Sequence, residues 1–174
     1  MTQPTNQPTI DGEKLRAIMR SVASPVIVIT TVVGENVWGI TLGSFASVSL
    51  APPLICFNIS RSSRMHDFLL QTERYAIHLL GADDASLSGR FSNPKRSAET
   101  MFEGLNLQIA EDGLPLIQGT MGILLCKPYA RHDAGDSSLF LGEVIETRNL
   151  NPDKLPLLFY SRSYRTVSDA PIIT

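Results

Sequence analysis

Short segments rich in β-branched residues recur along the chain, and turn-forming residues separate them. The densest segment is PVIVITTVV at residues 25–33, and the turn GEN at residues 34–36 leads from it into residues 37–41. This pattern predicts a β-hairpin, because β-branched side chains suit the pleated surface of a sheet. Further strands are predicted where Gly, Pro, Asp or Asn bound similar segments, at residues 45–50, 54–59, 75–80, 120–130, 139–147 and 157–160.

A helical spacing of apolar residues precedes the first strand. Four apolar residues follow Asp11 at positions i, i+3, i+4 and i+7, and the Asp11 side chain can cap the helix that they define. We therefore expect an amphipathic helix with one buried face, formed by Leu15, Ile18, Met19 and Val22. Shorter helices are predicted at residues 63–71, with Ser62 or Ser63 as the cap, at residues 82–91 and at residues 98–103.

These elements together favour a mainly β fold. Strands outnumber helices and do not alternate strictly with them, so we expect an antiparallel barrel with peripheral helices, in the all-β or α+β class. The length of 174 residues suits a single domain, which we place at residues 11–174 behind a polar, disordered tail at residues 1–10. The tail lacks the cationic and apolar regions of a targeting signal, and no apolar stretch is long enough to span a bilayer. We therefore expect a soluble, cytoplasmic protein.

Charge and cysteine content narrow the choice of partners. Charged residues make up 18% of the chain, against about 25% in typical globular proteins, which indicates that a partner subunit covers part of the surface. The formal net charge of -2 provides no general field for nucleic acid, so nucleic acid is not an expected partner. Cys56 and Cys126 lie in apolar runs without CxxC spacing, and both are expected to be buried free thiols.

Few residues indicate acid–base or metal chemistry. The motifs GxSxG, GxGxxG, GxxxxGK[ST] and HExxH are absent from the sequence. His132 stands in the stretch RHDAGD at residues 131–136, which we expect to be a loop where Asp and Gly serve the turn, so no metal site is predicted. His66, near Arg64, is a candidate for binding an anion, and His78 in an apolar strand is a candidate structural residue.

One stretch combines glycine with hydroxyl side chains between two predicted strands. It reads GITLGSFASVSLAPP at residues 39–53. Glycine permits close approach to the backbone, and Ser and Thr hydroxyls add hydrogen-bond donors. The stretch can therefore clamp a flat polar ring or a phosphate, and an ordinary serine-rich connection is the alternative.

An ordered series of motifs continues from this stretch toward the end of the chain. The sequence reads GITLGSFASVSLAPPL at residues 39–54, followed by NIS, RF, GDSSLFLGEV, PLLFY and RSY at residues 58–60, 90–91, 135–144, 156–160 and 162–164. In this order and at this spacing, the series resembles the flavin reductase-like family. These are FMN-binding split barrels that include the small reductase components of two-component monooxygenases. The resemblance spans about residues 15–164.

The resemblance implies both a fold and an activity. The implied fold is a split β-barrel of antiparallel Greek-key type, and the implied assembly is a homodimer that binds FMN or FAD near the subunit interface. The implied activity is hydride transfer from NADH or NADPH to the flavin, and the reduced flavin would supply a partner monooxygenase. Because the flavin and the nicotinamide carry this chemistry themselves, the protein needs no acid–base pair of its own.

The resemblance also assigns residues to parts of the flavin. Residues that contact the ring system, the ribityl chain and its phosphate are expected to be Thr41, Leu42, Gly43, Ser44, Ser47, Val48 and Ser49. A phosphate loop is expected at Ser60, Ser63 and Arg64, because a dianion requires a cation and hydrogen-bond donors. Arg90 and Phe91 are expected to shape the outer pocket where the second nucleotide enters, with a helix-end pair that covers the barrel as the alternative.

Three departures from the family pattern bear on catalysis. Leu42 and Gly43 replace the usual Ala-Ser, Ala51 replaces an acidic residue, and Ser137 stands where the family often has His. We place Ser137 beside the nicotinamide pocket as the candidate catalytic residue. Its hydroxyl can orient a carboxamide or a water but offers no positive charge to reduced flavin. Two other functions stay open, namely a flavin-binding split barrel without catalysis and a flavin oxidase related to the pyridoxamine phosphate type.

Overall fold

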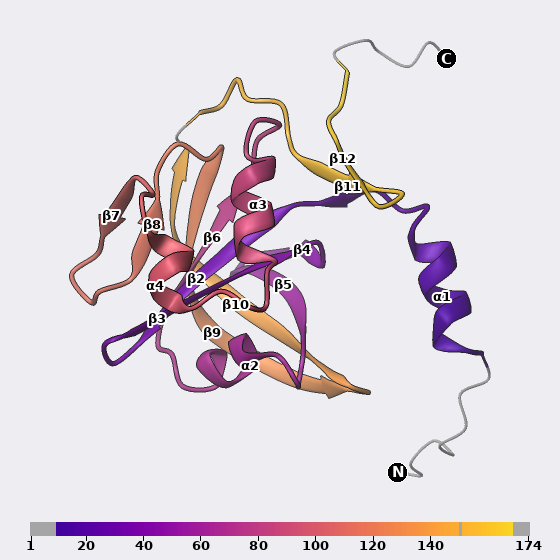
Figure 1. Ribbon diagram of the computed structural model, residues 1–174. Coiled ribbons are helices and arrows are strands. Elements are labelled where there is room, and N and C mark those ends of the chain that lie inside the picture. Colours follow the sequence, from indigo (N-terminus) through magenta and orange to yellow (C-terminus); the bar gives the residue numbers. More distant parts are fainter. Residues whose placement is uncertain (1–9, 150, 169–174) are drawn as a thin grey trace.

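A seven-stranded antiparallel sheet forms the body of the molecule (Figure 1). The computed structural model describes residues 10–149 and 151–168, so the predicted tail lies outside the described residues except for Ile10. The strands lie in the order β3-β2-β6-β9-β10-β5-β4. Their bounds are β2 (Ile27–Val33), β3 (Asn36–Leu42), β4 (Phe45–Leu50), β5 (Pro53–Ser60), β6 (Tyr75–Leu79), β9 (Gly122–Ala134) and β10 (Ser137–Asn149).

The connections between these strands confirm the predicted Greek-key barrel. Strands β6, β9 and β10 lie side by side, and β5, which precedes them in the chain, pairs with β10 at the far side. Register shifts between Leu141 and Gly142 and between Val144 and Glu146 interrupt the long β9–β10 ladder. Such irregularities increase strand twist and help a sheet curl. The curled sheet encloses a core whose largest buried side chains include Phe57 and Tyr75.

Two smaller sheets complete the β structure. Strands β1 (Ser24–Pro25), β11 (Leu158–Tyr160) and β12 (Ser163–Arg165) form one of them, and β7 (Leu107–Ile109) pairs with β8 (Pro115–Ile117) in the other. The sequence did not predict β1, β7, β8 or β12, because segments this short carry too little periodicity. The expectation of a loop around His132 was wrong, since β9 extends through His132 to Ala134. The β9–β10 ladder pairs His132 with Leu139 and holds this segment extended.

Three short helices pack on the barrel. The helices are α2 (Arg64–Leu69), α3 (Ala85–Phe91) and α4 (Ala98–Phe102), and α3 and α4 lie against β3 (Figure 1). Ser63 caps α2 as predicted, because its hydroxyl accepts a hydrogen bond from the Met65 N–H at 3.3 Å. None of the described helices is long and apolar enough to cross a membrane.

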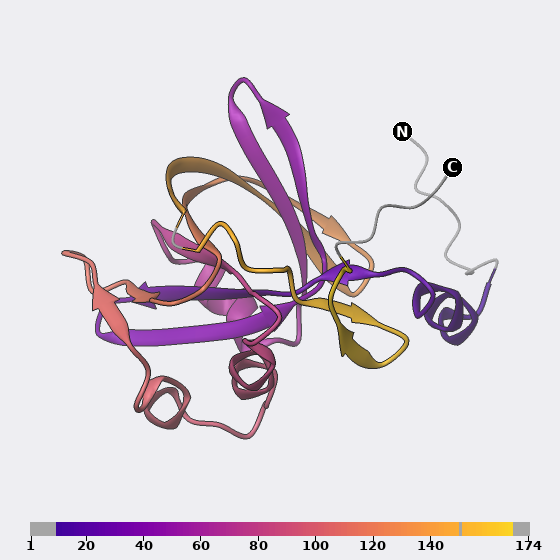
Figure 2. The same cartoon turned by 90° about the horizontal axis from the view of Figure 1, so that it is seen from above.

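Helix α1 (Gly12–Met19) stands beside the barrel next to the small β11–β12 ribbon (Figure 1, Figure 2). Asp11 caps it as predicted, accepting a hydrogen bond from the Glu13 N–H at 3.0 Å. The prediction of a buried face was wrong for the single chain, because α1 has no buried residue. Ile18 is 65% exposed, and Val22 lies beyond the helix end. The apolar stripe is present, but the chain itself provides nothing that covers it within the described residues.

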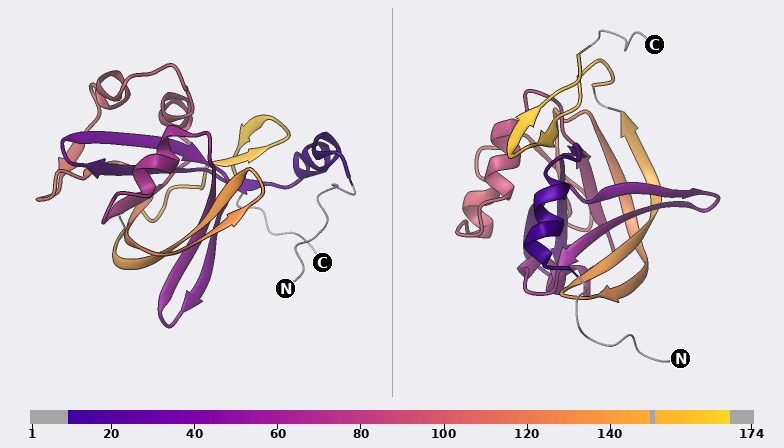
Figure 3. Two further views of the ribbon diagram at one scale, coloured as in Figure 1. Left: turned by 90° about the horizontal axis from the view of Figure 1, so that it is seen from below. Right: turned by 90° about the vertical axis from the view of Figure 1, so that its right-hand side faces the viewer.

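The β4–β5 hairpin extends away from the rest of the sheet (Figure 2, Figure 3). β4 is an edge strand, and in the part of the chain that the structure describes it pairs only with β5. Val48 is 49% exposed and Leu50 is 89% exposed on this hairpin. A projecting edge strand with exposed apolar side chains is a typical site of association with another chain.

His78 is a structural residue, as predicted. Its ring is fully buried, Nδ1 donates to the Val28 carbonyl at 3.1 Å, and Nε2 accepts from the Ile117 N–H at 2.9 Å. Burial lowers the pKa of His78 to about 4, so the ring is neutral at pH 7. Both cysteines are free thiols, but only Cys126 is buried. The prediction for Cys56 was wrong, because that side chain is only half-buried on β5.

Candidate functional site

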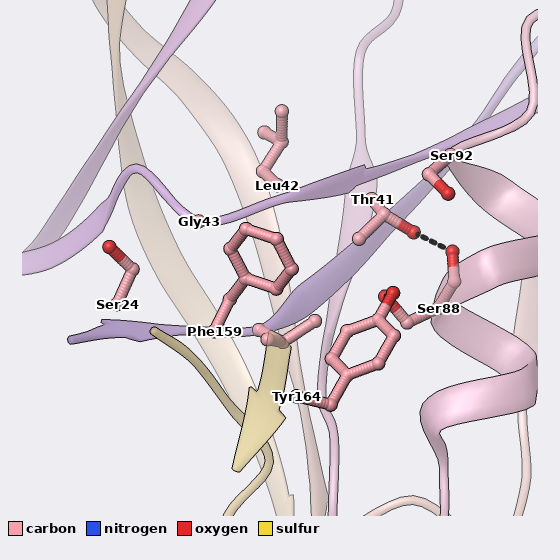
Figure 4. Close-up of a pocket in the computed structure, with 9 residues that line it drawn as sticks. Ser24, Thr41, Leu42, Gly43, Ser88, Ser92, Phe159 and Tyr164 are labelled. Atoms are coloured by element: carbon pink, nitrogen blue, oxygen red, sulfur yellow. Dashed lines mark hydrogen bonds between the residues drawn. The ribbon is translucent and has the colours of Figure 1, made fainter. Parts of the chain in front are cut away.

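A cavity of about 330 Å³ lies where strand β3 meets helix α3 and the β11–β12 ribbon (Figure 4). We call it the central cavity. It is lined by Ser24, Val26, Thr41, Leu42, Gly43, Ser88, Ser92, Phe159 and Tyr164. The structure therefore brings together three residues predicted to contact a flat ring, Thr41, Leu42 and Gly43, with side chains from distant parts of the chain.

Aromatic rings form one wall of the central cavity. Figure 4 shows Phe159 and Tyr164 side by side, and their ring centroids lie 5.6 Å apart at an interplanar angle of 68°. Hydrogen bonds to α3 fix the neighbouring groups, since the Tyr164 hydroxyl lies 2.8 Å from Ser88 Oγ and Thr41 Oγ1 donates to the Ser88 carbonyl at 2.7 Å. The Thr41 hydroxyl proton is thus already engaged, and Thr41 offers a ligand mainly its backbone.

Backbone groups at the end of strand β3 add to the polar side chains that line the central cavity. β3 is the first strand of the sheet, and among residues 10–149 and 151–168 it pairs only with β2. The backbone N–H and C=O groups of an edge strand that point away from its neighbour are free to bind another group. Next to Phe159, these groups at Thr41–Gly43 can hydrogen-bond the polar edge of a ring whose faces pack against apolar side chains.

A second cavity of about 380 Å³ continues along β3, and we call it the serine–arginine cavity. It shares Ser92 with the central cavity and is lined by Trp38, Gly39, Ile40, Ser62, Ser63, Arg64, Phe91, Ser92, Asn93, Pro94, Arg96 and Met101. The Arg64 guanidinium lies over the Trp38 ring, 4.3 Å from its centroid. Two cations and several hydroxyl groups around one cavity suit a phosphate group.

The serine–arginine cavity contains three predicted residues, Ser63, Arg64 and Phe91, and two further residues that the motif series does not assign to the flavin. Arg96 and Trp38 also line it. Trp38 directly precedes the glycine-rich stretch, which was a usable signal. Arg96 forms a cluster of cations with Arg90 and Lys95 in the sequence, and such a cluster is a candidate for binding a small anion. The β3 residues of the two cavities run from Trp38 to Leu42, and these two residues are about 14 Å apart along an extended strand. This length separates a ring in one cavity from a phosphate in the other.

Several predicted residues lie outside both cavities. The Ser44 hydroxyl donates to the Asn58 carbonyl at 3.1 Å and ties β4 to β5. Ser60 Oγ lies 2.9 Å from Ser62 Oγ, and Arg90 Nη1 donates to the Glu103 carbonyl at 2.5 Å. The projecting hairpin carries the remaining three, Ser47, Val48 and Ser49. Their contact with a flavin stays a prediction that requires a neighbouring subunit or a rearranged loop.

Ser137 lies at the start of β10, directly across from Ser60 on β5. Its hydroxyl donates to Asp136 Oδ1 at 2.9 Å, and it lines neither cavity. Its placement beside a nicotinamide therefore stays a prediction.

The next residue, Ser138, is fully buried and links His66 with Asp133, a contact that the sequence did not predict. Ser138 Oγ donates to Asp133 Oδ1 at 2.9 Å and lies 3.0 Å from Nε2 of the buried His66. The bond from Ser138, and then the charge of Arg131, lowers the pKa of Asp133 below its usual value. A chain of hydrogen bonds through Ser138 thus holds His66 in place. Side chains alternate between the two faces of a strand, so the sequence did indicate that either Ser137 or Ser138 would face inward.

A sequence profile of the flavin reductase-like domain matches residues 19–168. The chain belongs to this family. The resemblance drawn from the motif series is therefore confirmed, and the flavin reductase-like domain extends over most of the described residues.

Related flavin reductases match nearly the whole chain. An FMN reductase (NADH), SmoA of Agrobacterium fabrum, is 35% identical over 145 residues, which cover 83% of this chain and 81% of SmoA. The reductase subunit HsaB of a flavin-dependent monooxygenase of Mycobacterium tuberculosis is 30% identical, covering 89% of this chain and 82% of HsaB. The NADH:FAD oxidoreductase SgcE6 of Streptomyces globisporus, in complex with NAD and FAD fragments, superposes with a TM-score of 0.83 at 28% identity, covering 94% of this chain and 98% of SgcE6.

The residues of the flavin reductase-like domain fit a flavin on structural grounds. A flavin ring system is flat, with broad apolar faces and one polar edge, and the central cavity offers aromatic side chains next to a free strand edge. A flavin phosphate requires cations and donors, which Arg64, Arg96 and Ser63 provide at the serine–arginine cavity.

Proposed function

We propose that this protein is a flavin reductase that binds FMN or FAD and reduces it with NADH or NADPH. The observation that carries the proposal is the pair of cavities joined at Ser92, one apolar beside the free edge of β3 and one lined by Arg64 and Arg96. The activity agrees with the names of the relatives SmoA and SgcE6.

The protein's part in this reaction is binding, orientation and exclusion of water. When bound, the flavin supplies the hydride acceptor and the nicotinamide supplies the hydride. The backbone at Thr41–Gly43 would orient the polar edge of the flavin ring, and Phe159 would pack beside it, because both line the central cavity. Arg64 and Arg96 would hold the phosphate end, and contacts at both ends of the flavin would fix the position of its ring along β3. No side chain needs to transfer a proton for hydride transfer to occur.

Two measurements on the purified protein test the proposal. FMN and FAD are titrated to high micromolar concentration while flavin fluorescence and the visible spectrum are recorded, and NAD(P)H oxidation is followed with and without added flavin. Quenching together with flavin-dependent oxidation supports a reductase. Flavin binding without NAD(P)H oxidation would show a binding protein instead, and oxidation of an amine substrate by bound flavin would show an oxidase.

We further propose that the protein is a homodimer. The exposed apolar stripe of α1 and the exposed Val48 and Leu50 on the projecting hairpin support this assembly, as does the low fraction of charged residues. A second copy that covers these surfaces would also bring Ser47, Val48 and Ser49 next to a flavin site. Sedimentation is expected to give about twice the chain mass of 19.1 kDa.

A monooxygenase is the partner that we propose for the reduced flavin, in the cytoplasm. The relative HsaB is the reductase subunit of a flavin-dependent monooxygenase, and it supports this assignment. A reductase that supplies a separate enzyme must release its product. With a large excess of free FMN over protein, we expect many turnovers per subunit and hydrogen peroxide formation from released reduced flavin. A single turnover per subunit would contradict release.

A further inference from the structure

A third cavity adjoins the central cavity on the side away from Arg64. It has a volume of about 200 Å³ and lies between α1 and the β11–β12 turn. Ser24 and Phe159 line both this cavity and the central one, whereas Ser92 joins the central cavity to the serine–arginine cavity. Figure 4 shows Ser24 and Ser92 at opposite sides of the central cavity, so the three cavities form a continuous row.

Arginine dominates this third cavity, which we call the arginine cavity. Its lining consists of Arg16, Met19, Arg20, Val22, Ser24, Phe159, Ser161 and Arg162, with no acidic residue among them. Arg16 pairs with Glu13 on the same helix at 2.5 Å. Among the described residues, Arg20 and Arg162 have no carboxylate partner. Two uncompensated cations therefore face one small cavity, which suits an anion.

Arg162 lies in a tight turn between β11 and β12 whose backbone conformation is rare for arginine. Tyr160 pairs with Ser163, so Ser161 and Arg162 form a two-residue hairpin turn, and both have positive φ, 49° and 64°. Such turns favour Asn-Gly because side chains other than Asn, Asp and Gly are strained in the left-handed region. The Ser161 N–H donates to the Arg20 carbonyl at 3.0 Å, which fixes the turn against the end of α1. An arginine stands where glycine would be more stable.

We propose that the arginine cavity binds a phosphate of a dinucleotide whose ring end lies in the central cavity, and specifically the NAD(P)H co-substrate. The inference rests on the proposed function. If Arg64 and Arg96 bind the flavin phosphate at one end of the row, Arg20 and Arg162 at the opposite end are available to bind a phosphate of the second nucleotide. The pyrophosphate of FAD has the same chemistry and is the other source of such a phosphate.

Two single variants, Arg162→Gly and Arg20→Gln, test the proposal, with Arg165→Gln as the matched control on the same ribbon. Arg165 is exposed and lies outside the cavity, and its guanidinium donates to the adjacent Tyr164 carbonyl. Equilibrium dissociation constants are measured for FMN, FAD, NADH, NADPH and reduced nicotinamide riboside, which has no phosphate. We expect each variant to weaken NADH or NADPH binding about 10-fold or more, as for loss of a charge-assisted bond. FMN and the riboside should bind as to wild type.

The stability of Arg162→Gly separates binding from folding. Glycine relieves the left-handed backbone, so the variant should melt no lower than wild type, and lost affinity then reflects the missing guanidinium. If only the affinity for FAD falls, the cavity binds the pyrophosphate of FAD, and its assignment to NAD(P)H is wrong. Unchanged NADH, NADPH and FAD affinities in both variants, or an equal loss in Arg165→Gln, would overturn the site. Failure of the proposed function is distinct, because wild-type protein would then bind no flavin.

Discussion

Phe91 packs directly against Gly39, and a Cβ at Gly39 would lie 2.5 Å from Cε1 of Phe91 and 3.3 Å from the Ile29 carbonyl oxygen. The contact sets the distance between α3 and β3, the two elements that enclose both cavities of the proposed flavin site. Glycine at this position is required by close approach rather than by backbone conformation.

Gly39→Ala is expected to destabilise the protein by about 1–3 kcal/mol, because Phe91 is buried and must shift to admit a methyl group. Urea unfolding measures the change. Gly89→Ala on α3 is the control, since nothing lies within 4 Å of the added Cβ, and it is expected to add up to about 1 kcal/mol of helix stability. Equal stability of the Gly39→Ala variant and wild type would show that Phe91 can move freely.

Arg64→Ala is expected to weaken FMN binding by about 1.5–3 kcal/mol and to leave riboflavin binding nearly unchanged, since the lost charge-assisted contact is to phosphate. Fluorescence titration with both ligands measures the difference. Arg61→Ala is the control, because the Arg61 guanidinium donates to the Gly135 carbonyl and lines neither cavity of the site. Equal losses for FMN and riboflavin would give Arg64 a purely structural role, stacked over Trp38.

Much of this architecture follows from local sequence signals. The β-branched segments fixed the central strands, and the predicted strand at residues 45–50 coincides with β4. Ser63 and Asp11 cap their helices as their residue types indicate. The motif at residues 39–54 predicted which β3 residues line the site, because glycine together with Ser and Thr between two strand segments is easily seen in the sequence.

The other side of the site depends on tertiary packing that no local pattern encodes. Ser88, Phe159 and Tyr164 reach the central cavity from α3 and the β11–β12 ribbon, and their positions follow from how the chain folds back on β3. The stripe on α1 was predicted correctly as a pattern but wrongly as buried, since amphipathic spacing indicates that a face will be covered without indicating by which chain.

His78 makes stability depend on pH between about 4 and 6.5. Its folded pKa of about 4 is below the unfolded value of 6.5, so the unfolded chain binds more protons in this range and stability falls as pH falls. The loss attributable to His78 is about 3 kcal/mol by pH 4. Urea unfolding of wild type and His78→Gln at several pH values tests this, and the stability difference between them should narrow as pH decreases. Parallel curves would contradict the assignment.

Leu50→Asp is expected to shift the proposed homodimer toward monomer, because a charge would replace an apolar side chain that is 89% exposed in the single chain. Sedimentation at several concentrations measures the shift, and melting of the barrel should change little since Leu50 buries little area in the single chain. Leu70→Asp, at a half-exposed position after α2, is the control and should stay dimeric. If the wild-type protein is a monomer and still binds flavin tightly, the subunit interface takes no part in the flavin site.

Ser137→His is expected to leave FMN affinity unchanged and to accelerate flavin reduction. Ser137 begins β10 opposite Ser60, and its side chain already contacts the Asp136 carboxylate. An imidazole at this position would be held by that carboxylate, which favours its charged form, and it could offer reduced flavin the positive charge that a hydroxyl lacks. His132→Ala is the control, because His132 is exposed on the neighbouring strand β9. Stopped-flow reduction measures the rates, and no change from Ser137→His would place this end of the β9–β10 hairpin outside the mechanism.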